Sequence, residues 1–311
     1  MKTNRIRQNV FPVLAAFIWG TAFVAQSMGA DYVEPFTFNA SRSLVAAVVL
    51  SLGLGLFRLV RPQEDRRTPI QRRQDRRELL LGGFCCGTAL AVATNLQQLG
   101  IGSTSAGKAS FITALYIVLV PICGLFFHKK VTPLVWVSVA LAVVGLYCIC
   151  VKEGFSIAPG DFYVLLCAFC FTAHILCIDH FTQRVDGVPL SCVQFLVATI
   201  WSALGMVLTE SPTVAGLQAS LWPILYVGIF SSGVAYTLQI LAQKGSNPTV
   251  VSLLLSLEAV FGALSGAVVL HERMSTREYL GCAIMLAAVV LAQLPTPKKR
   301  TAPAAEQTAA K

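Results

Sequence analysis

The chain contains 311 residues, of which 55% are hydrophobic and only 13% are charged, and its mean hydropathy is +0.69. Soluble domains carry about 25% charged residues, so this composition excludes a soluble globular enzyme, and the high apolar content excludes a disordered chain. The net charge of +9 does not indicate nucleic-acid binding, because eight of the 24 Lys and Arg residues lie in one stretch, 58–77, between two apolar segments.

Apolar segments long enough to span a membrane follow one another along the chain. About 20 apolar residues cross the hydrocarbon core as a helix. Because these segments are apolar on all sides, and backbone groups in lipid must be paired internally, we predict helices rather than a barrel. The ten predicted transmembrane helices are 10–29, 36–57, 79–99, 105–127, 132–151, 160–180, 189–209, 221–242, 248–270 and 276–294.

The first segment, 10–29, has the features of a signal peptide, with Lys2, Arg5 and Arg7 before an apolar run. Nine further segments follow it, so we interpret it as an uncleaved first helix.

Basic residues orient the predicted helices. With the N-terminus in the cytoplasm, 19 of the 24 basic residues fall in cytoplasmic segments, and only Lys152, Arg273 and Arg277 fall on the opposite side. The positive-inside rule then predicts a multi-pass protein of a bacterial-type plasma (inner) membrane with both termini in the cytoplasm. Contact of the basic segments with anionic membrane lipid is a minor additional expectation.

The ten cysteines lie mostly inside the apolar segments, where a disulfide framework is not expected. Cys167 and Cys170 have the spacing of a redox or metal pair, but they lie in the middle of the segment 160–180. We interpret the cysteines as small hydrophobic residues and expect neither a metal nor a cofactor.

Weak internal similarity divides the chain into two halves. At an offset of 152 residues, Leu44-Val45-Ala46 matches Leu196-Val197-Ala198, and at an offset of 143, Gly102-Ser103 matches Gly245-Ser246. Five helices per half is an odd number, so the second half is predicted to be inverted relative to the first.

The predicted fold is therefore an all-α integral membrane protein of ten transmembrane helices in two inverted five-helix repeats. The predicted organisation is an N-terminal cytoplasmic tail 1–9, a first repeat 10–151, a periplasmic linker 152–159, a second repeat 160–295, and a disordered cytoplasmic tail 296–311.

Several sequence elements resemble the drug/metabolite transporter superfamily, and within it the EamA-type transporters. The stretch Trp19-Gly20-x-x-Phe23 looks like the family's opening W-G-x-x-F signature, and the segment from Ser105 to Pro121 is close to its A-G-K-A-x-F-I-x-x-L-Y-x-x-x-V-P stretch. Arg42 with Ala46 follows its R-x-x-x-A pattern. The second half carries Leu257-Glu258-Ala259-Val260 and His271-Glu272-Arg273, which resemble the family's L-E-P-V and G-E-R elements.

The resemblance covers roughly residues 10–294 and implies the EamA-like fold and transport of a small organic solute, such as an amino acid, another metabolite, a nucleobase or a drug. Two residues depart from the pattern. Ala259 stands where the family usually has Pro, so residue type predicts no kink there, and His271 stands where it usually has Gly.

Ionisable residues inside membrane helices are costly and therefore candidates for function. Glu258 lies near the middle of its segment, where it is either a proton-accepting or ammonium-binding group, or a hydrogen-bonded link between helices. Arg42 either binds a substrate carboxylate or holds backbone carbonyls, and Lys108 either faces inward beside Tyr116 or extends to the membrane surface. His174 either titrates during transport or bonds a neighbouring helix, which leaves Glu258 and His174 as the possible coupling residues.

Uncharged polar side chains form two stripes at helical spacing. Thr88, Asn95 and Gln98 follow one segment, and Ser232, Tyr236, Gln239 and Gln243 follow the equivalent segment of the second half. Such stripes face protein or water. We predict that they line one central cavity, although hydrogen bonding between helices alone is the alternative. The candidate cavity residues are Trp19, Gln26, Asn95, Gln98, Tyr116, His174, Tyr236, Gln239 and Glu258.

The function that these patterns favour is a secondary transporter of a small-molecule solute, amino acid-like or otherwise, acting by alternating access as an exporter. No catalytic residue is predicted, because the sequence has no Walker loop, nucleophile elbow or H-E-x-x-H motif. The alternatives are an integral-membrane transferase acting on a lipid-linked substrate and a passive channel. The sequence leaves open whether the protein is a monomer or a homodimer.

Overall fold

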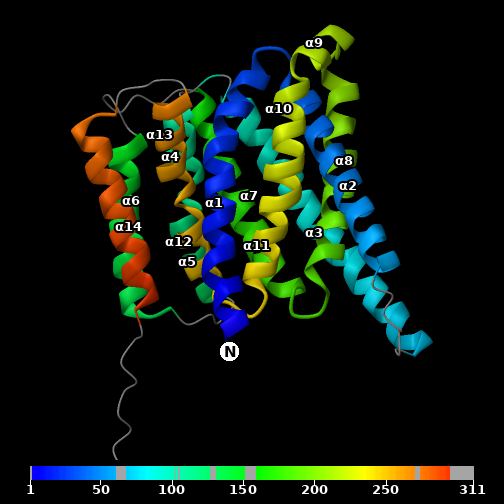
Figure 1. Cartoon of the computed structure of the whole chain (residues 1–311), viewed down its shortest axis with the longest axis horizontal. Coiled ribbons are helices and arrows are strands. Elements are labelled where there is room, and N and C mark those ends of the chain that lie inside the picture. Colours follow the sequence, from blue (N-terminus) through cyan, green and yellow to red (C-terminus); the bar gives the residue numbers. More distant parts are fainter. Residues whose placement is uncertain are drawn as a thin grey trace, which may run out of the picture.

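The computed structural model describes residues 2–60, 68–101, 103, 106–126, 131–150, 159–269 and 274–294, and within these ranges every regular element is a helix (Figure 1). The first half contains α1 (Lys2–Ala30), α2 (Pro35–Val60), α3 (Pro69–Ile101), α4 (Ala106–Thr113), α5 (Tyr116–Phe126) and α6 (Pro133–Cys150). The second half contains α7 (Pro159–Phe181), α8 (Gly187–Thr209), α9 (Val214–Ala219), α10 (Leu221–Tyr226), η1 (Val227–Ala235), α11 (Tyr236–Gln243), α12 (Pro248–Leu255), α13 (Glu258–Val269) and α14 (Thr276–Gln293).

Nine helical segments of the described chain are long and apolar enough to cross a membrane, and a tenth apolar helix, Pro133–Ile149, is shorter. Large apolar side chains such as Leu52, Phe126 and Val207 are exposed on the outside of the bundle. Because a bundle in lipid does not need to hide apolar surface from water, this exposure is expected of a multi-pass membrane protein.

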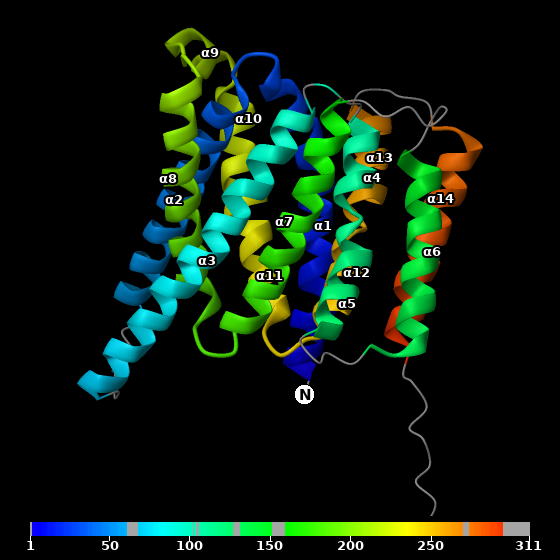
Figure 2. The same cartoon turned by 180° about the vertical axis from the view of Figure 1, so that it is seen from behind.

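The packing of α1 and α7 is similar on the two sides of the bundle. Figure 1 shows α1 between the segment η1–α11 and the pair α12 and α13, all of which it contacts. Figure 2 shows α7 between α3 and the pair α4 and α5, which it also contacts. In addition, α2 packs on α8 and α6 packs on α14. Most of the extensive packing therefore joins the first half of the chain to the second.

Glycines allow some of these helices to approach closely. A Cβ atom at Gly145 of α6 would lie 2.9 Å from the carbonyl oxygen of Gly281 in α14, and one at Gly281 would lie 2.7 Å from that of Gly145. A Cβ at Gly20 would lie 2.6 Å from the Cβ of Phe261, which fixes the close contact of α1 with α13. The amide nitrogen of Gly262 lies at the same contact, 2.7 Å from that Cβ position at Gly20.

Two predicted transmembrane helices are interrupted at equivalent places. The segment 105–127 divides into α4 and α5 at residues 114–115, and the segment 248–270 divides into α12 and α13 at residues 256–257. At the first break the Leu115 and Ile117 amides donate to the carbonyls of Ile112 and Ala114. At the second break the residues exactly 142 positions later do the same: Leu257 donates to Leu254, and Ala259 donates to Ser256.

The second break arises without proline. Ala259 lies just after the break, where the family usually has Pro, and its residue type predicted no kink. At the break the chain tightens to hydrogen bonds between residues three apart. The hydroxyl of Ser256 also donates to the carbonyl of Leu253 at 2.7 Å, a bond of the kind that bends helices.

The predicted segment 221–242 is also irregular, because its middle part, η1, is a π-helix. The Tyr236 amide that follows it donates to the carbonyl of Ser231, five residues earlier. Such wide turns are frequent at functional sites.

The start of α1, the end of α14 and the start of α3 lie at the same end of the bundle in Figure 1. This placement agrees with a common side for both ends of the chain, and the assignment of that side to the cytoplasm stays a prediction. The linker 152–158, the His271-Glu272-Arg273 element and the tail 296–311 lie outside the described residues, as does the side chain of Lys108.

Candidate solute site

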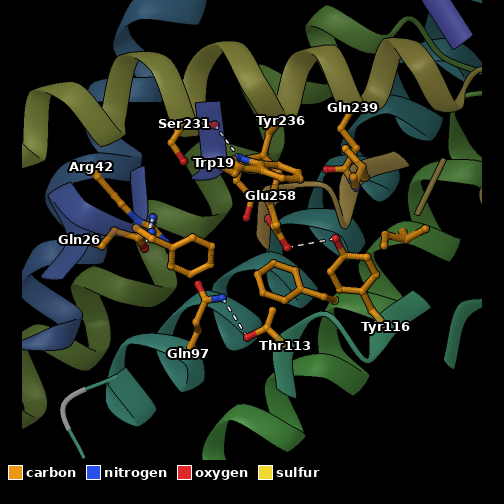
Figure 3. A pocket seen from close by; sticks show the side chains of 14 residues that line it. Trp19, Gln26, Arg42, Gln97, Thr113, Tyr116, Ser231, Tyr236, Gln239 and Glu258 are labelled. Atoms are coloured by element: carbon orange, nitrogen blue, oxygen red, sulfur yellow. Dashed lines mark hydrogen bonds between the residues drawn. The ribbon is translucent and has the colours of Figure 1, made fainter. Parts of the chain in front are cut away.

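A cavity lies in the centre of the bundle and is lined from both halves of the chain (Figure 3). The first half contributes Trp19, Phe23, Gln26, Arg42, Gln97, Thr113 and Tyr116, and the second half contributes Phe171, Ile175, Ser231, Tyr236, Gln239, Leu255 and Glu258. The two helix breaks and the π-helix all border this cavity, so the irregular backbone of the bundle is concentrated around it. In membrane proteins irregular backbone is tolerated where it lines such a cavity.

The free space in this conformation is small. The centres of water molecules can occupy about 40 Å³ of the cavity, which is room for about three waters. An organic solute therefore needs further opening of the bundle before it fits between these side chains.

Glu258 and Tyr116 connect the two interrupted helices at the cavity. Glu258 is the first residue of α13 and Tyr116 is the first residue of α5. The Tyr116 hydroxyl donates to Glu258 Oε1 at 3.1 Å, and both side chains are almost completely buried. Within the described part of the chain no basic side chain forms an ion pair with Glu258. Its second oxygen is left for a ligand or water.

Among the described lining residues, Arg42 supplies the positive charge. It extends from α2, is 3% exposed, and donates from Nη1 to Gln26 Oε1 at 3.0 Å. Its guanidinium carbon also lies 5.9 Å from the centre of the Phe38 ring. No carboxylate in the described ranges pairs with Arg42. Figure 3 shows Arg42 and Glu258 as separate groups around one space.

Tyr236 is the centre of an aromatic cluster on one wall. Its ring centre lies 4.7 Å from that of Trp19, 5.7 Å from that of Phe195 and 5.9 Å from that of His174. The Trp19 indole nitrogen donates to the Ser231 carbonyl at 3.3 Å, so α1 is tied to the π-helix at the cavity. The cluster fixes the orientation of two lining rings, Trp19 and Tyr236.

Two amide side chains complete the polar lining. Gln97 donates from Nε2 to the Thr113 hydroxyl at 3.3 Å, beside the first helix break. Gln239 is 2% exposed, and its Oε1 has no hydrogen-bond partner within the described residues. A buried acceptor of this kind is costly unless a ligand or water donates to it.

The two halves of the sequence match one and the same protein family, over residues 8–151 and 158–294. The chain belongs to the EamA-like transporter family. It is 32% identical over 292 residues to an uncharacterized transporter of Archaeoglobus fulgidus, with 94% of this chain and 87% of that protein covered. An uncharacterized transporter of Synechocystis is 27% identical, with 93% and 91% covered. A WAT1-related chloroplastic protein of Arabidopsis thaliana is 24% identical, with 90% of this chain and 67% of that protein covered.

A solved crystal structure shares the fold, with a TM-score of 0.75 at 18% identity, covering 92% of this chain and 96% of that chain. These relationships identify the protein as an EamA-like membrane transporter rather than an enzyme, with a small-molecule solute as its substrate. The described residues also contain no cluster of His, Cys, Asp and Glu that would hold a metal.

The EamA fold places most of the predicted cavity residues together. Trp19, Gln26, Tyr116, Tyr236, Gln239 and Glu258 all line the cavity, and so does Arg42, whose role the sequence left open.

Asn95, Gln98 and His174 lie outside the lining. Asn95 accepts a hydrogen bond from Asn39 Nδ2 at 2.9 Å and donates to the Ser202 hydroxyl at 2.9 Å, so it links α2, α3 and α8. His174 is completely buried, with Nε2 3.1 Å from Gln194 Oε1. Gln98 is buried beside the cavity residue Gln97. The contacts of Asn95 and His174 are typical of helix packing, whereas Gln98 Oε1 is buried without a hydrogen-bond partner among the described residues.

Seven lining residues were not predicted: Phe23, Gln97, Thr113, Phe171, Ile175, Ser231 and Leu255. Gln97 comes immediately before Gln98, the last residue of the predicted stripe on α3, and therefore points to a different side of that helix. Thr113 and Leu255 come directly before the two breaks, which no sequence pattern had indicated. Nothing in the sequence distinguishes the apolar lining residues from apolar side chains that face lipid.

Proposed function

We propose that this EamA-like protein is a secondary transporter that carries a small organic solute through its central cavity by alternating access. The moving parts are two inverted repeats of five helices, 10–151 and 160–295, in which the short helix α6 is the fifth span of the first repeat. The observation that supports this best is the cavity itself, because both halves line it and the two interrupted helices meet there at the Tyr116–Glu258 hydrogen bond.

The inverted relation is supported by the direction of the interrupted helices. In Figure 1, α4 and α13 lie toward one end of the bundle, and α5 and α12 lie toward the other. The first interrupted helix therefore runs opposite to the second, while their breaks have the same hydrogen bonds at an offset of 142 residues. Two inverted repeats around a midplane site are the architecture in which rocking exposes the site to each side in turn.

The small free volume fits this cycle. Since the cavity in this conformation holds only a few waters, an organic solute enters only when one half tilts away from the other. Of the two predicted coupling residues, only Glu258 lines the cavity, so we assign it the coupling role if transport consumes a proton gradient.

We further propose export across a bacterial-type plasma membrane, with both termini in the cytoplasm. The distribution of basic residues, most of which belong to segments on the side of the N-terminus, supports the placement of the termini, whereas export is proposed from the family resemblance alone.

The test is counterflow in proteoliposomes made with the purified full-length protein. Vesicles preloaded with one unlabelled solute from a panel of amino acids, amines, organic acids and nucleobases receive the labelled solute outside. A carrier predicts saturable uptake that the internal solute stimulates. Uptake that is linear with concentration and indifferent to the internal solute contradicts alternating access and indicates a channel.

A further inference from the structure

The charges of the cavity define the chemistry of the solute. Resting on the proposed transport function, we propose that the solute is a zwitterion, held with its acidic group at Arg42 and its ammonium group at Glu258. Neither the family match nor the names of the relatives assigns a substrate or these contacts.

The Arg42 end of the cavity lacks an anion. A guanidinium carries five N–H donors, and Arg42 uses one of them on Gln26. A cation inside a membrane protein is costly unless it is paired, and neither Gln26 nor the Phe38 ring neutralises it. A carboxylate or similar anionic group of the solute supplies both the missing charge and the missing acceptors.

Among the described side chains, the Glu258 end of the cavity has no cation and only one donor, the Tyr116 hydroxyl. The carboxyl of Glu258 receives one hydrogen bond, from Tyr116, and the nearby lining residue Gln239 has an acceptor, Oε1, without a donor. An ammonium group carries three N–H donors and one positive charge. It can pair with Glu258 and still has donors for a further acceptor of the lining, such as Gln239 Oε1.

Aromatic rings also line the cavity that contains Arg42 and Glu258. Trp19, Phe23, Tyr116, Phe171 and Tyr236 all face the cavity. Their faces attract an ammonium group by cation–π interaction and give the carbon skeleton of a solute an apolar contact. No ion pair joins Arg42 to Glu258 in the described structure, so both charges are free to take a partner from the solute.

Other charge types fit less well. A neutral solute displaces water and leaves the Arg42 cation without an anion and the Glu258 carboxyl without a cationic partner. A simple cation pairs with Glu258 but brings a second positive charge toward Arg42, and a simple anion does the reverse at Glu258. Only a zwitterion matches both ends, and the unpaired groups discriminate against the other types.

The experiment uses sets of probes that share one carbon skeleton. One set is phenylalanine with phenethylamine and 3-phenylpropionate, a second is valine with isobutylamine and isovalerate, and a third is 4-aminobutyrate with butylamine and butyrate. Competition against counterflow and thermal stabilisation of the purified protein are measured for each probe. In at least one set we expect the zwitterion to bind at least about tenfold more tightly than its amine or its acid, as the loss of one charged hydrogen-bonded contact implies.

Variants separate the two ends of the site. Arg42→Gln should shift the preference toward the amine, and Glu258→Gln should shift it toward the acid. Arg42→Lys and Glu258→Asp retain the charges and should retain the zwitterion preference even where the neutral variants fold poorly. The matched controls are Arg184→Gln and Glu78→Gln, which remove the same charges from a surface ion pair outside the cavity and should leave the preference unchanged.

The outcomes distinguish this inference from the proposed function. Saturable exchange of amines, acids or neutral solutes with which no zwitterion competes overturns the inference and leaves the transporter intact. An equal loss of all three probe types in both neutral variants also overturns it. Selective stabilisation by zwitterions without exchange supports the site and contradicts the transport function, and absence of zwitterion binding in every set contradicts the site.

Discussion

The two interrupted helices of this protein have the same backbone and different chemistry. Both tighten to hydrogen bonds between residues three apart, at 114–115 in the first and at 256–257 in the second. At the first position after each break, the first helix carries Tyr116 and the second carries Glu258, and these two side chains hydrogen-bond to each other. The same backbone interruption therefore occurs in both halves, and the side chain at one equivalent position determines that the second half supplies the acid.

The difference makes the cavity electrically asymmetric. The acid comes from the second half and the buried cation, Arg42, comes from the first. A cavity formed by two identical halves would carry its charges in equivalent pairs around the centre. Divergence of the two halves therefore provides distinct ends that can orient a solute.

Exchanging Tyr116 and Glu258 tests whether the two positions after the breaks are equivalent, and we expect it to have the largest effect. Glu258→Tyr alone removes the partner proposed for the ammonium group of the solute, so we expect counterflow of a zwitterion to fall about 100-fold, in line with loss of a buried charged contact. The double variant Tyr116→Glu with Glu258→Tyr restores an acid and its hydroxyl partner at equivalent positions. We expect it to recover about tenfold over Glu258→Tyr, and a double variant no better than the single one would show that the positions are not equivalent.

The contact of the second interrupted helix with α1 gives the next largest effect. A Cβ at Gly20 would lie 2.6 Å from the Cβ of Phe261 and 2.7 Å from the amide nitrogen of Gly262. Gly20→Ala forces α1 away from α13 and should lower the free energy of unfolding by about 1–3 kcal/mol. Gly262→Ala is the matched control, since its nearest neighbour would be 3.7 Å away. Denaturant unfolding of both variants in detergent checks this, and equal stability of the two contradicts the close contact.

Removal of the hydroxyl of Tyr116 tests the link between the two breaks. Tyr116→Phe keeps the ring and removes only the 3.1 Å bond to Glu258. The expected cost is about 1 kcal/mol, which corresponds to roughly a fivefold weaker binding of the solute if Glu258 needs this partner for its orientation. Solute affinity by competition is the measurement. An unchanged affinity would limit the role of Tyr116 to packing.

Ser256 gives the smallest expected effect. Its hydroxyl donates to the Leu253 carbonyl beside the second break, but the corresponding residue at the first break is Ala114, which has no hydroxyl. Because the first helix breaks without such a bond, Ser256→Ala should keep the break and lower stability by only about 0.5 kcal/mol, the lower end of the range for a lost hydrogen bond. Thermal unfolding measures this, and a large loss would mean that the two breaks have different causes.

The sequence was sufficient to predict a multi-pass helical membrane protein and to single out Glu258 and Arg42 among the ionisable residues, but His174, also predicted for the cavity, lies outside its lining. Apolar segments of about 20 residues are unambiguous in a chain this poor in charge. Glu258 and Arg42 stand out because ionisable groups inside membrane helices are rare. Trp19 and Tyr236 were found through polar spacing and family resemblance.

The remaining features depend on tertiary packing. Neither break contains glycine or proline, so no residue type indicated residues 114–115 or 256–257. The rotation of α3 about its axis places Gln97 rather than Gln98 at the cavity. The spacing of polar residues in the sequence does not determine this rotation closely enough to distinguish two adjacent residues. His174 is completely buried beside Gln194 of α8 and does not reach the cavity, which depends on how the helices pack and not on residue type.

The most direct test of alternating access is the accessibility of the cavity from each side of the membrane. Ser231 lines the cavity, and Ser231→Cys changes it minimally in a chain whose native cysteines are replaced by alanine or serine. A membrane-impermeant maleimide is then applied to right-side-out and inside-out vesicles, with and without a transported solute. The account predicts labelling from both sides, slowed from both sides by saturating solute. Labelling from one side alone, whatever solute is present, would contradict it.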